Sequence, residues 1–313
     1  MKTFTSAALA AAVAMYASVA SAACDDVADG FASLNGGTTG GRGGTEVTVD
    51  NVDDLRQYAA AEGPYIIKVQ GTIVVEPEGE ELEVASDKTI VGVGANAAIA
   101  QGGFGIHGVQ NVIIRNLRIT NPGDPDTSDH DGIQADGSSN IWIDHCHFEA
   151  GGDGLVDLRR DTTFWTVSNN IFRNHDKTFG IGWTENVVAE GTIHHNWFDN
   201  TNQRNPSADN LLHAHLYNNY VTGITSYGHY ARGATDARIE NVYFSDTRNP
   251  VTTDPEATLT SVGNIYDGTS GTVAADQGES FDPAAFYAYA LDATEDVPGI
   301  VEARAGPRAN VCS

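Results

Sequence analysis

An asparagine followed two positions later by an aromatic residue recurs through the second half of this chain. The pairs are Asn170 with Phe172, Asn196 with Phe198, Asn218 with Tyr220, Asn241 with Tyr243 and Asn264 with Tyr266. Successive pairs begin 26, 22, 23 and 23 residues apart. Because a period of about 20 to 50 residues is typical of repeat proteins, each interval predicts one structural unit that stacks on the next.

Short runs with alternating apolar residues lie around each pair, as in NIWIDHCHF at 140–148 and TFWTVSNNIF at 163–172. Such runs predict β-strands, and no unit has room for the helix of a leucine-rich or helical repeat. We therefore expect an all-β parallel β-helix, a single-stranded solenoid in which each strand pairs with its equivalent in the next coil. Asparagines stacked at the bends would bond one another along the axis. A β-sandwich also has short strands with regular turns, but it does not account for the matched pairs.

The two ends of the chain carry different signals. Residues 1–22 have a lysine near the start, an apolar middle and small residues at the end, which is the pattern of a secretory signal peptide cleaved after Ala22. We expect a secreted, extracellular protein without a membrane-spanning segment, in which residues 23–313 form a single domain. A short capping helix should begin at Asn51 and end at Gly63 and cover the open end of the solenoid. The coils should end near Tyr266, and an irregular or partly helical tail should pack along the outside or cap the last coil.

Charge limits the classes of ligand. The formal net charge is -25, from 42 acidic and 17 basic residues, which is the opposite of the balance in a nucleic-acid-binding protein. A polyanionic ligand would need a local group of cations, or metal ions held by acidic side chains.

The three cysteines are Cys24, Cys146 and Cys312, an odd number that leaves one of them unpaired within the chain or paired between chains. Cys146 lies in a predicted strand and is expected to be buried as a small apolar residue. A bond between Cys24 and Cys312 would require the tail to fold back along the solenoid.

Four charged residues recur at the same interval as the repeat. They are Asp131, Asp153, Lys177 and Arg204, separated by 22, 24 and 27 residues. If one interval is one coil, the four form a column on one face. Each of them taken alone is more typical of a solvated turn or of the protein surface. Together they predict a groove that holds a polyanion.

Asp157 lies four residues after Asp153, so the two carboxylates share a face of a strand or approach each other across a bend at Gly154. Three carboxylates that close raise one another's pKa unless a cation lies among them. Hard oxygen ligands favour Ca²⁺ or Mg²⁺ over zinc or copper, and an open, flexible site favours Ca²⁺. Asp131, Asp153 and Asp157 are therefore the candidate metal ligands. The pairs at His194–His195 and at His213 with His215 lack a third ligand at a fixed offset, so we expect structural roles for them.

Several spaced motifs resemble the polysaccharide lyases of family 1, the pectate lyase family. They are WIDH at 142–145, DGLVD at 153–157, TVSNN at 166–170, HDK at 175–177, and HHNWF with QRNP between 194 and 206. The resemblance implies a right-handed parallel β-helix and Ca²⁺-dependent β-elimination of polygalacturonate. By motif position it implies that Asp131, Asp153 and Asp157 bind Ca²⁺, that Lys177 binds a substrate carboxylate, and that Arg204 removes the C5 proton. Asp129 would help to hold a further Ca²⁺ when substrate is present.

An arginine is ordinarily protonated at neutral pH, so the resemblance also predicts an alkaline working pH. One position departs from the family pattern: Asp209 stands five residues after Arg204, where many members have a second arginine that grips the substrate. Polygalacturonate is the expected partner of a monomeric enzyme, with no nucleic acid or membrane involved. The alternatives are a calcium-independent pectin lyase acting on methyl-esterified pectin, a polygalacturonate hydrolase, and a non-catalytic β-helix binding protein.

Overall fold

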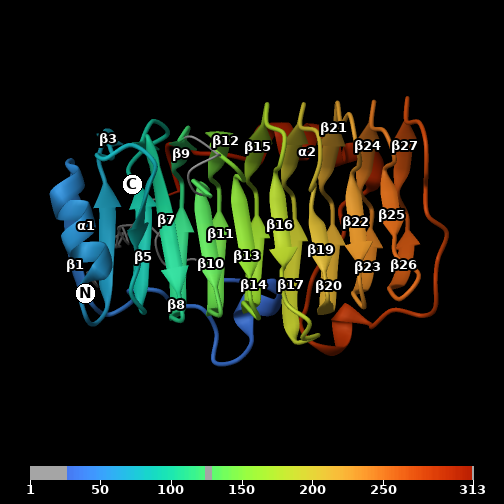
Figure 1. Cartoon of the computed structure of the whole chain (residues 1–313), viewed down its shortest axis with the longest axis horizontal. Coiled ribbons are helices and arrows are strands. Elements are labelled where there is room, and N and C mark those ends of the chain that lie inside the picture. The colour runs from blue at the N-terminus through green and yellow to red at the C-terminus, as the bar shows by residue number, and fades with distance from the viewer. Residues whose placement is uncertain (1–26, 124–128, 312–313) are drawn as a thin grey trace, which may run out of the picture.

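The computed structural model describes residues 27–123 and 129–311. Figure 1 shows strands stacked side by side along one long axis, with a helix at the N-terminal end of the stack. The predicted signal peptide lies outside the described residues. Within the described part of the chain, no helix is long and apolar enough to span a membrane.

The strands form three parallel sheets that run the length of the stack. The ten-stranded sheet contains β1 (Thr45–Val49), β2 (Tyr65–Val69), β5 (Lys88–Gly92), β8 (Gln110–Arg115), β11 (Ser139–Asp144), β14 (Thr163–Ser168), β17 (Ala189–His194), β20 (Leu211–Tyr217), β23 (Asp236–Glu240) and β26 (Thr258–Val262). The nine-stranded sheet contains β3 (Thr72–Val74), β6 (Ala98–Ala100), β9 (Arg118–Asn121), β12 (His147–Gly151), β15 (Ile171–Arg173), β18 (Trp197–Asp199), β21 (Tyr220–Thr222), β24 (Tyr243–Ser245) and β27 (Ile265–Asp267). The eight-stranded sheet contains β4 (Glu80–Glu83), β7 (Gly102–His107), β10 (Ile133–Asp136), β13 (Val156–Arg159), β16 (Phe179–Gly182), β19 (Ser207–Asp209), β22 (His229–Arg232) and β25 (Val251–Thr253).

From β2 onward, the chain visits the three sheets in a fixed order, from the ten-stranded to the nine-stranded to the eight-stranded, and then begins the next coil. Each strand hydrogen-bonds to the strand one coil away, as β11 does to β14. The all-β parallel solenoid predicted from the repeat is therefore confirmed. A sandwich of antiparallel sheets is excluded.

Aromatic rings stack inside the solenoid because equivalent positions face one another. The rings of Phe148 and Phe172 have centroids 5.3 Å apart, and those of Phe172 and Phe198 are 5.0 Å apart. All three side chains are fully buried. Burial of such a side chain stabilises a fold by about 1.5–3 kcal/mol, so the stack accounts for Phe172 and Phe198 of the repeat. Tyr220 and Tyr243 lie one residue before the equivalent inner positions, which Val221 and Phe244 occupy.

The asparagine half of the repeat is an amide ladder between the ten-stranded and nine-stranded sheets. The Asn170 side chain donates to Asn196 Oδ1 at 3.0 Å, and the Asn196 side chain donates to Asn219 Oδ1 at 3.1 Å. The prediction was wrong by one residue for Asn218 and Asn241. Both adopt the left-handed conformation, with φ of 48° and 49°, one position before the ladder. Asparagine tolerates that conformation, so it is favoured at both positions.

A helix covers the N-terminal coil, as expected. In α1 (Val52–Ala60), the Asn51 side chain accepts a hydrogen bond from the Asp54 amide at 3.0 Å, and Leu55 and Ala59 are buried against the first coils. The helix ends at Ala60 rather than at Gly63. Gly63 has a φ of 81° and belongs to the turn that leads into β2.

The last coil ends with β27, which contains Tyr266 as predicted. The tail contains 3-10 helices η3 (Pro283–Ala285) and η4 (Thr294–Asp296) and helix α2 (Val297–Arg304), and it runs back along the outside of the stack. The Gly306 amide donates to the Asn169 carbonyl at 2.7 Å, and the Arg308 amide donates to Asn116 Oδ1 at 2.7 Å. Cys146 is a buried free thiol; Cys24 and Cys312 lie outside the described residues.

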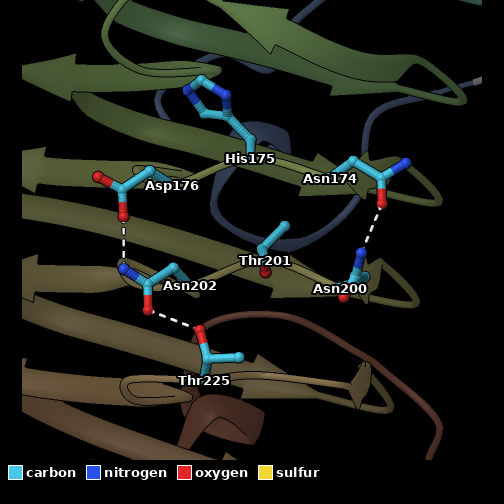
Figure 2. A pocket seen from close by; sticks show the side chains of 7 residues that line it. All are labelled: Asn174, His175, Asp176, Asn200, Thr201, Asn202 and Thr225. Atoms are coloured by element: carbon cyan, nitrogen blue, oxygen red, sulfur yellow. Dashed lines mark hydrogen bonds between the residues drawn. The ribbon is translucent and has the colours of Figure 1, made fainter.

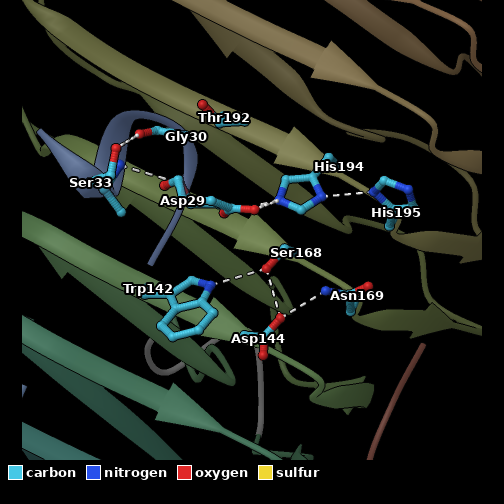
Figure 3. A network of polar contacts seen from close by, with 12 residues as sticks. Asp29, Gly30, Ser33, Trp142, Asp144, Ser168, Asn169, Thr192, His194 and His195 are labelled. Carbon is cyan, nitrogen blue, oxygen red and sulfur yellow. Dashed lines mark hydrogen bonds and ion pairs between the residues drawn. The ribbon is translucent and has the colours of Figure 1, made fainter. Parts of the chain in front are cut away.

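The N-terminal lead-in lies on the outer face of the ten-stranded sheet, where it forms 3-10 helix η2 (Gly30–Ser33). Figure 3 shows Asp29 bonded to His194, and His194 bonded to His195. Their distances are 3.1 Å and 2.8 Å, and His195 bonds Asp292 of the tail at 3.0 Å. These histidines therefore join the two ends of the chain to the solenoid, which agrees with the structural role expected from the sequence.

The amide ladder provides a test of what stabilises the coils. Asn196→Ala would remove the acceptor of the Asn170 backbone amide and the side-chain donor to the Val167 carbonyl, while the Asn170 side chain keeps its bond to the Ile143 carbonyl. We expect the free energy of unfolding to fall by about 2–4 kcal/mol, since each unsatisfied buried group costs about 1–3 kcal/mol. Denaturant unfolding followed by circular dichroism measures the change. Gln110→Ala, at an exposed position of β8, is the control, and equal stability of the two variants would contradict the prediction.

One buried histidine, His229, and two half-buried ones, His147 and His195, make the fold sensitive to acid. Burial lowers the pKa of His147, His195 and His229 from 6.5 to about 4, so they stay neutral in the folded protein but protonate near 6.5 when it unfolds. Their contribution to stability is present above pH 6.5 and is lost as the pH falls to about 4. We expect the melting temperature to fall over that window. His195→Asn, which suits the φ of 54° there, should melt lower at pH 7 and show a shallower fall; parallel curves would refute the assignment.

Candidate active site on the eight-stranded sheet

The five predicted site residues lie along one strip of the solenoid. They are Asp131 before β10, Asp153 before β13, Asp157 within β13, Lys177 before β16 and Arg204 before β19. Four of them occupy the turns that lead from the nine-stranded sheet into the eight-stranded sheet. Because neighbouring strands are about 4.8 Å apart, these residues follow the axis coil by coil, as their sequence spacing predicted.

Asp131 and Asp157 are buried carboxylates, with exposed fractions of 0% and 2%. The Gly154 amide donates to Asp131 Oδ1 at 2.7 Å, and the Gly180 amide donates to Asp157 Oδ1 at 3.1 Å. Burial raises the pKa of Asp131. Burial also raises the pKa of Asp157 well above its usual range, and the charge of Asp131 raises it further. A cation beside these side chains would relieve both effects.

Glu81 adds a carboxyl group that the sequence analysis missed. It lies in β4, two strands before β10 in the sheet, and accepts a hydrogen bond from the Asp131 amide at 2.9 Å. Burial raises the pKa of Glu81 to about 7, and the charges of Asp131 and Asp129 add to the rise. Glu81 lies 50 residues, about two coils, before Asp131. The coil between them has Gly103 opposite Glu81 instead of a charged residue, which interrupts the column.

Asp153 faces Lys177 across one coil, and the two side chains form a close ion pair. His175 fixes the turn because its Nε2 lies 2.8 Å from the Asp153 carbonyl. The Asp153 carboxylate therefore points to the ammonium instead of completing a cluster with Asp131 and Asp157. Within residues 27–123 and 129–311, no three acidic, histidine or cysteine side chains are grouped closely enough to hold a metal ion.

The donor set nevertheless fits a hard divalent cation. Asp131 and Asp157 offer buried carboxylate oxygens that repel each other. Among the residues that the structure describes, no basic side chain comes closer to them than Arg204, whose Nη1 lies 3.9 Å from Asp157 Oδ2. Asp153 can join them by exchanging its partner Lys177. Such oxygen ligands favour Ca²⁺, so these three residues are the ones that would hold it.

Asp129 has a different environment. Its carboxylate accepts hydrogen bonds from Arg159 at 2.8 Å and from Gln134 at 3.0 Å. The bond from Arg159 lowers the pKa of Asp129. A metal ion at Asp129 would therefore have to compete with a guanidinium, which the spacing of the residues did not reveal.

Arg204 lies at the far end of the strip. Its backbone is in the left-handed region, with a φ of 59°, and the Phe179 amide donates to its carbonyl at 2.7 Å. The guanidinium carbon lies 5.1 Å from the centre of the Trp183 ring. Nη1 lies 3.9 Å from Asp157 Oδ2 and is buried without a hydrogen-bond partner. An unsatisfied buried donor reduces the stability of the fold. The Arg204 guanidinium is therefore free to donate a hydrogen bond to a bound ligand.

Beside Lys177 the same turns form a polar hollow. Figure 2 shows side chains from three successive turns around it. Its volume is about 390 Å³, and its lining is Asn174, His175, Asp176, Asn200, Thr201, Asn202 and Thr225. Asn200 donates to Asn174 at 2.7 Å, and Thr225 donates to Asn202 at 2.7 Å. Amide, hydroxyl and carboxylate groups of this kind suit the hydroxyl groups of a carbohydrate.

Solved structures place this fold among the pectate lyase β-solenoids. The chain is similar to a pectate lyase from Bacillus sp. N165 in complex with trigalacturonate, with a TM-score of 0.76 and 28% identity over 90% of this chain and 98% of that chain. It is also similar to a variant pectate lyase from Xanthomonas campestris, with a TM-score of 0.75 and 25% identity over 92% of this chain and 100% of that chain.

A family model described as pectate lyase matches residues 1–306, and the chain belongs to the pectate lyase family. A pectate trisaccharide-lyase of Thermotoga sp. strain RQ2 is 36% identical over 91% of this chain and 90% of that protein. A pectate trisaccharide-lyase of Bacillus licheniformis is 34% identical over 88% of this chain and 85% of that protein.

The buried carboxylates should reduce the stability of the metal-free protein. Asp157→Asn removes a buried charge and its repulsion with Asp131, while the amide oxygen can still accept from Gly180. We expect the variant to unfold with a free energy about 1–3 kcal/mol higher than the parent chain in a chelator. Melting curves in EDTA test this, with Glu256→Gln, at an exposed position, as the control. A less stable Asp157→Asn protein would contradict the electrostatic account.

Proposed function

We propose that this chain is a secreted pectate lyase that cleaves de-esterified polygalacturonate by Ca²⁺-dependent β-elimination and leaves 4,5-unsaturated oligogalacturonides. The observation that carries the proposal is the strip itself: buried carboxylates, an ammonium and a partly unsatisfied guanidinium lie on successive coils of one sheet. The names of the relatives and the signal-like residues 1–22 support the substrate and the secretion.

Lys177 and Arg204 would act on the same sugar unit. The Lys177 ammonium, once it leaves Asp153, pairs with the carboxylate carried on C5 of the substrate and stabilises the negative charge that develops there. Ca²⁺ held by Asp131, Asp153 and Asp157 would act as a Lewis acid on that carboxylate. The Trp183 ring supports one face of the Arg204 guanidinium and restricts where the group can point.

The elimination needs a base at one atom and a leaving group at the next. Arg204, in its neutral form, takes the proton from C5. The electron pair of the C5–H bond becomes the C4–C5 double bond, and the C4–O bond breaks. The departing oxygen takes a proton from solvent, so the products are a new chain end with a hydroxyl group and an unsaturated uronate. Since a neutral guanidine is rare at neutral pH, activity should increase toward alkaline pH.

Two substrates distinguish the proposal from its nearest alternative. On polygalacturonate the protein should produce the ultraviolet absorbance of the unsaturated product, lose at least about nine-tenths of the rate in EDTA, and recover it with added Ca²⁺, because metal-free carboxylates repel the substrate. The presence of Asp131, Asp153 and Asp157 argues against a pectin lyase, which would lack these acidic calcium ligands. Activity on methyl-esterified pectin that EDTA does not affect would overturn the proposal in favour of that enzyme.

Arg204→Ala, purified in the same way as the parent chain, tests whether Arg204 is the base. Loss of the base should reduce the rate to the background while the circular dichroism spectrum and melting temperature remain close to those of the parent chain. A variant that retains the parent rate would exclude Arg204 as the base and leave the substrate assignment intact.

A further inference from the structure

Trp183 is a large aromatic residue in a position that stability does not explain. It follows β16 directly, its side chain is 48% exposed, and its φ of 55° lies in the left-handed region. That region is strained for a bulky aromatic residue, and strain of this kind is retained mostly at functional sites. The indole ring lies against the Arg204 guanidinium, whose carbon is 5.1 Å from the ring centre. The ring is therefore a candidate for a role in the site.

Gly180 lets this ring approach β16 closely. A Cβ atom at residue 180 would lie 2.2 Å from Trp183 Cη2 and 2.7 Å from Asp157 Oδ1, so a side chain there would collide with the ring. The edge of the ring and the carboxylate therefore lie close together over the same glycine. Trp183 thus adjoins both Arg204 and Asp157, the candidate base and a candidate metal ligand.

The opposite charges of Arg204 and Asp157 face each other without forming a close pair. Arg204 Nη1 lies 3.9 Å from Asp157 Oδ2. The same nitrogen is buried and has no hydrogen-bond partner among the described residues. A shift of about 1 Å would give a charge-assisted hydrogen bond of ordinary length, so a neighbouring group must hold the two side chains apart.

Arg173 shows that an indole stacked on a guanidinium does not by itself prevent such a pair. Its guanidinium carbon lies 4.7 Å from the centre of the Trp197 ring. It nevertheless forms an ion pair with Asp199 at 2.5 Å. The separation at Arg204 therefore needs a further cause, and the Trp183 ring supplies one because its edge already lies beside the carboxylate.

We propose that Trp183 is a positioning residue, whose ring is a spacer that keeps the Arg204 guanidinium from pairing with Asp157. The proposal rests on the roles that the proposed function gives to these two residues. A close pair would impair both roles. The guanidinium would point to Asp157 instead of to the substrate, and a carboxylate oxygen that Ca²⁺ needs would already be bonded to a cation. The spacer keeps both groups available.

Trp183→Ala tests the spacer by its effect on catalysis. Without the ring, the guanidinium should close on Asp157, so kcat on polygalacturonate at saturating Ca²⁺ should fall at least about ten-fold, while KM changes less than about three-fold. Trp183→Phe keeps an aromatic ring there and should recover most of kcat. Trp197→Ala removes an indole that stacks on Arg173, outside the strip, and should behave as the parent.

Calcium binding in the absence of substrate gives a second measurement. Isothermal titration calorimetry with Ca²⁺ should give a Kd at least about three-fold higher for Trp183→Ala than for the parent chain, because the metal must displace a guanidinium from Asp157. In an Arg204→Ala background, the same substitution of Trp183 should leave the Kd unchanged, because no guanidinium remains to close on the carboxylate. The two backgrounds together isolate the coupling between the ring and Arg204.

The outcomes separate this inference from the proposed function. A parent chain without lyase activity on polygalacturonate, or without Ca²⁺ binding, overturns the proposed function and the spacer with it. An active, Ca²⁺-binding parent in which Trp183→Ala leaves either kcat or the Kd unchanged overturns the spacer alone. A Kd that rises equally with and without Arg204 would also overturn it. So would equal losses in Trp183→Ala and Trp183→Phe with lowered melting temperatures, because the ring would then only support the local fold.

Discussion

The in-register pairing of successive parallel strands is the constraint on which the rest of this structure depends. It places each residue opposite its equivalent one coil away, as with Phe172 and Phe198 inside the solenoid and Asp157 and Gly180 outside it. Inside, the result is a row of stacked rings beside a ladder of amides, interrupted at Val221 and Val242. Outside, it is a set of rows in which side chains from different coils reach one ligand. The same pairing therefore stabilises the fold and assembles the site.

The period of the solenoid was predictable from the sequence, but the alignment of its coils was predictable only in part. Asn170 and Asn196 occupy the ladder as expected, whereas Asn218 and Asn241 lie one residue before it. The ladder position and the left-handed residue that precedes it both favour asparagine, for different reasons: hydrogen bonding along the axis in one case, tolerance of positive φ in the other. Spacing alone does not separate these two environments. Because Val242 occupies the fourth ladder position, the sequence has no asparagine there to show that the ladder continues one residue after Asn241.

The site divides in the same way. Asp131, Asp153, Lys177 and Arg204 were predictable because each occupies the same turn of successive coils. Glu81 and Trp183 were not. Glu81 lies two coils before Asp131 with the uncharged Gly103 opposite it in the next coil, and Trp183 reaches the column through a left-handed turn after β16. The interval also brought Asp153 to the right coil without revealing its partner. The ion pair with Lys177 determines where the Asp153 carboxylate points, and the spacing of the residues does not predict that orientation.

Two of the three outer faces of the solenoid differ in how their buried charged groups are paired. On the ten-stranded sheet, beneath the lead-in and the tail, charged groups meet partners: Asp29 bonds His194, and Glu240 bonds both His215 and Tyr289. On the eight-stranded sheet, the described residues leave a buried guanidinium nitrogen of Arg204 unbonded and keep two carboxylates buried side by side. Unsatisfied charges reduce stability and are retained where a ligand satisfies them. The covered face can therefore supply the stability that the open face lacks. Under the proposed function, a bound cation and a polyuronate chain would neutralise the unpaired charges of the open face.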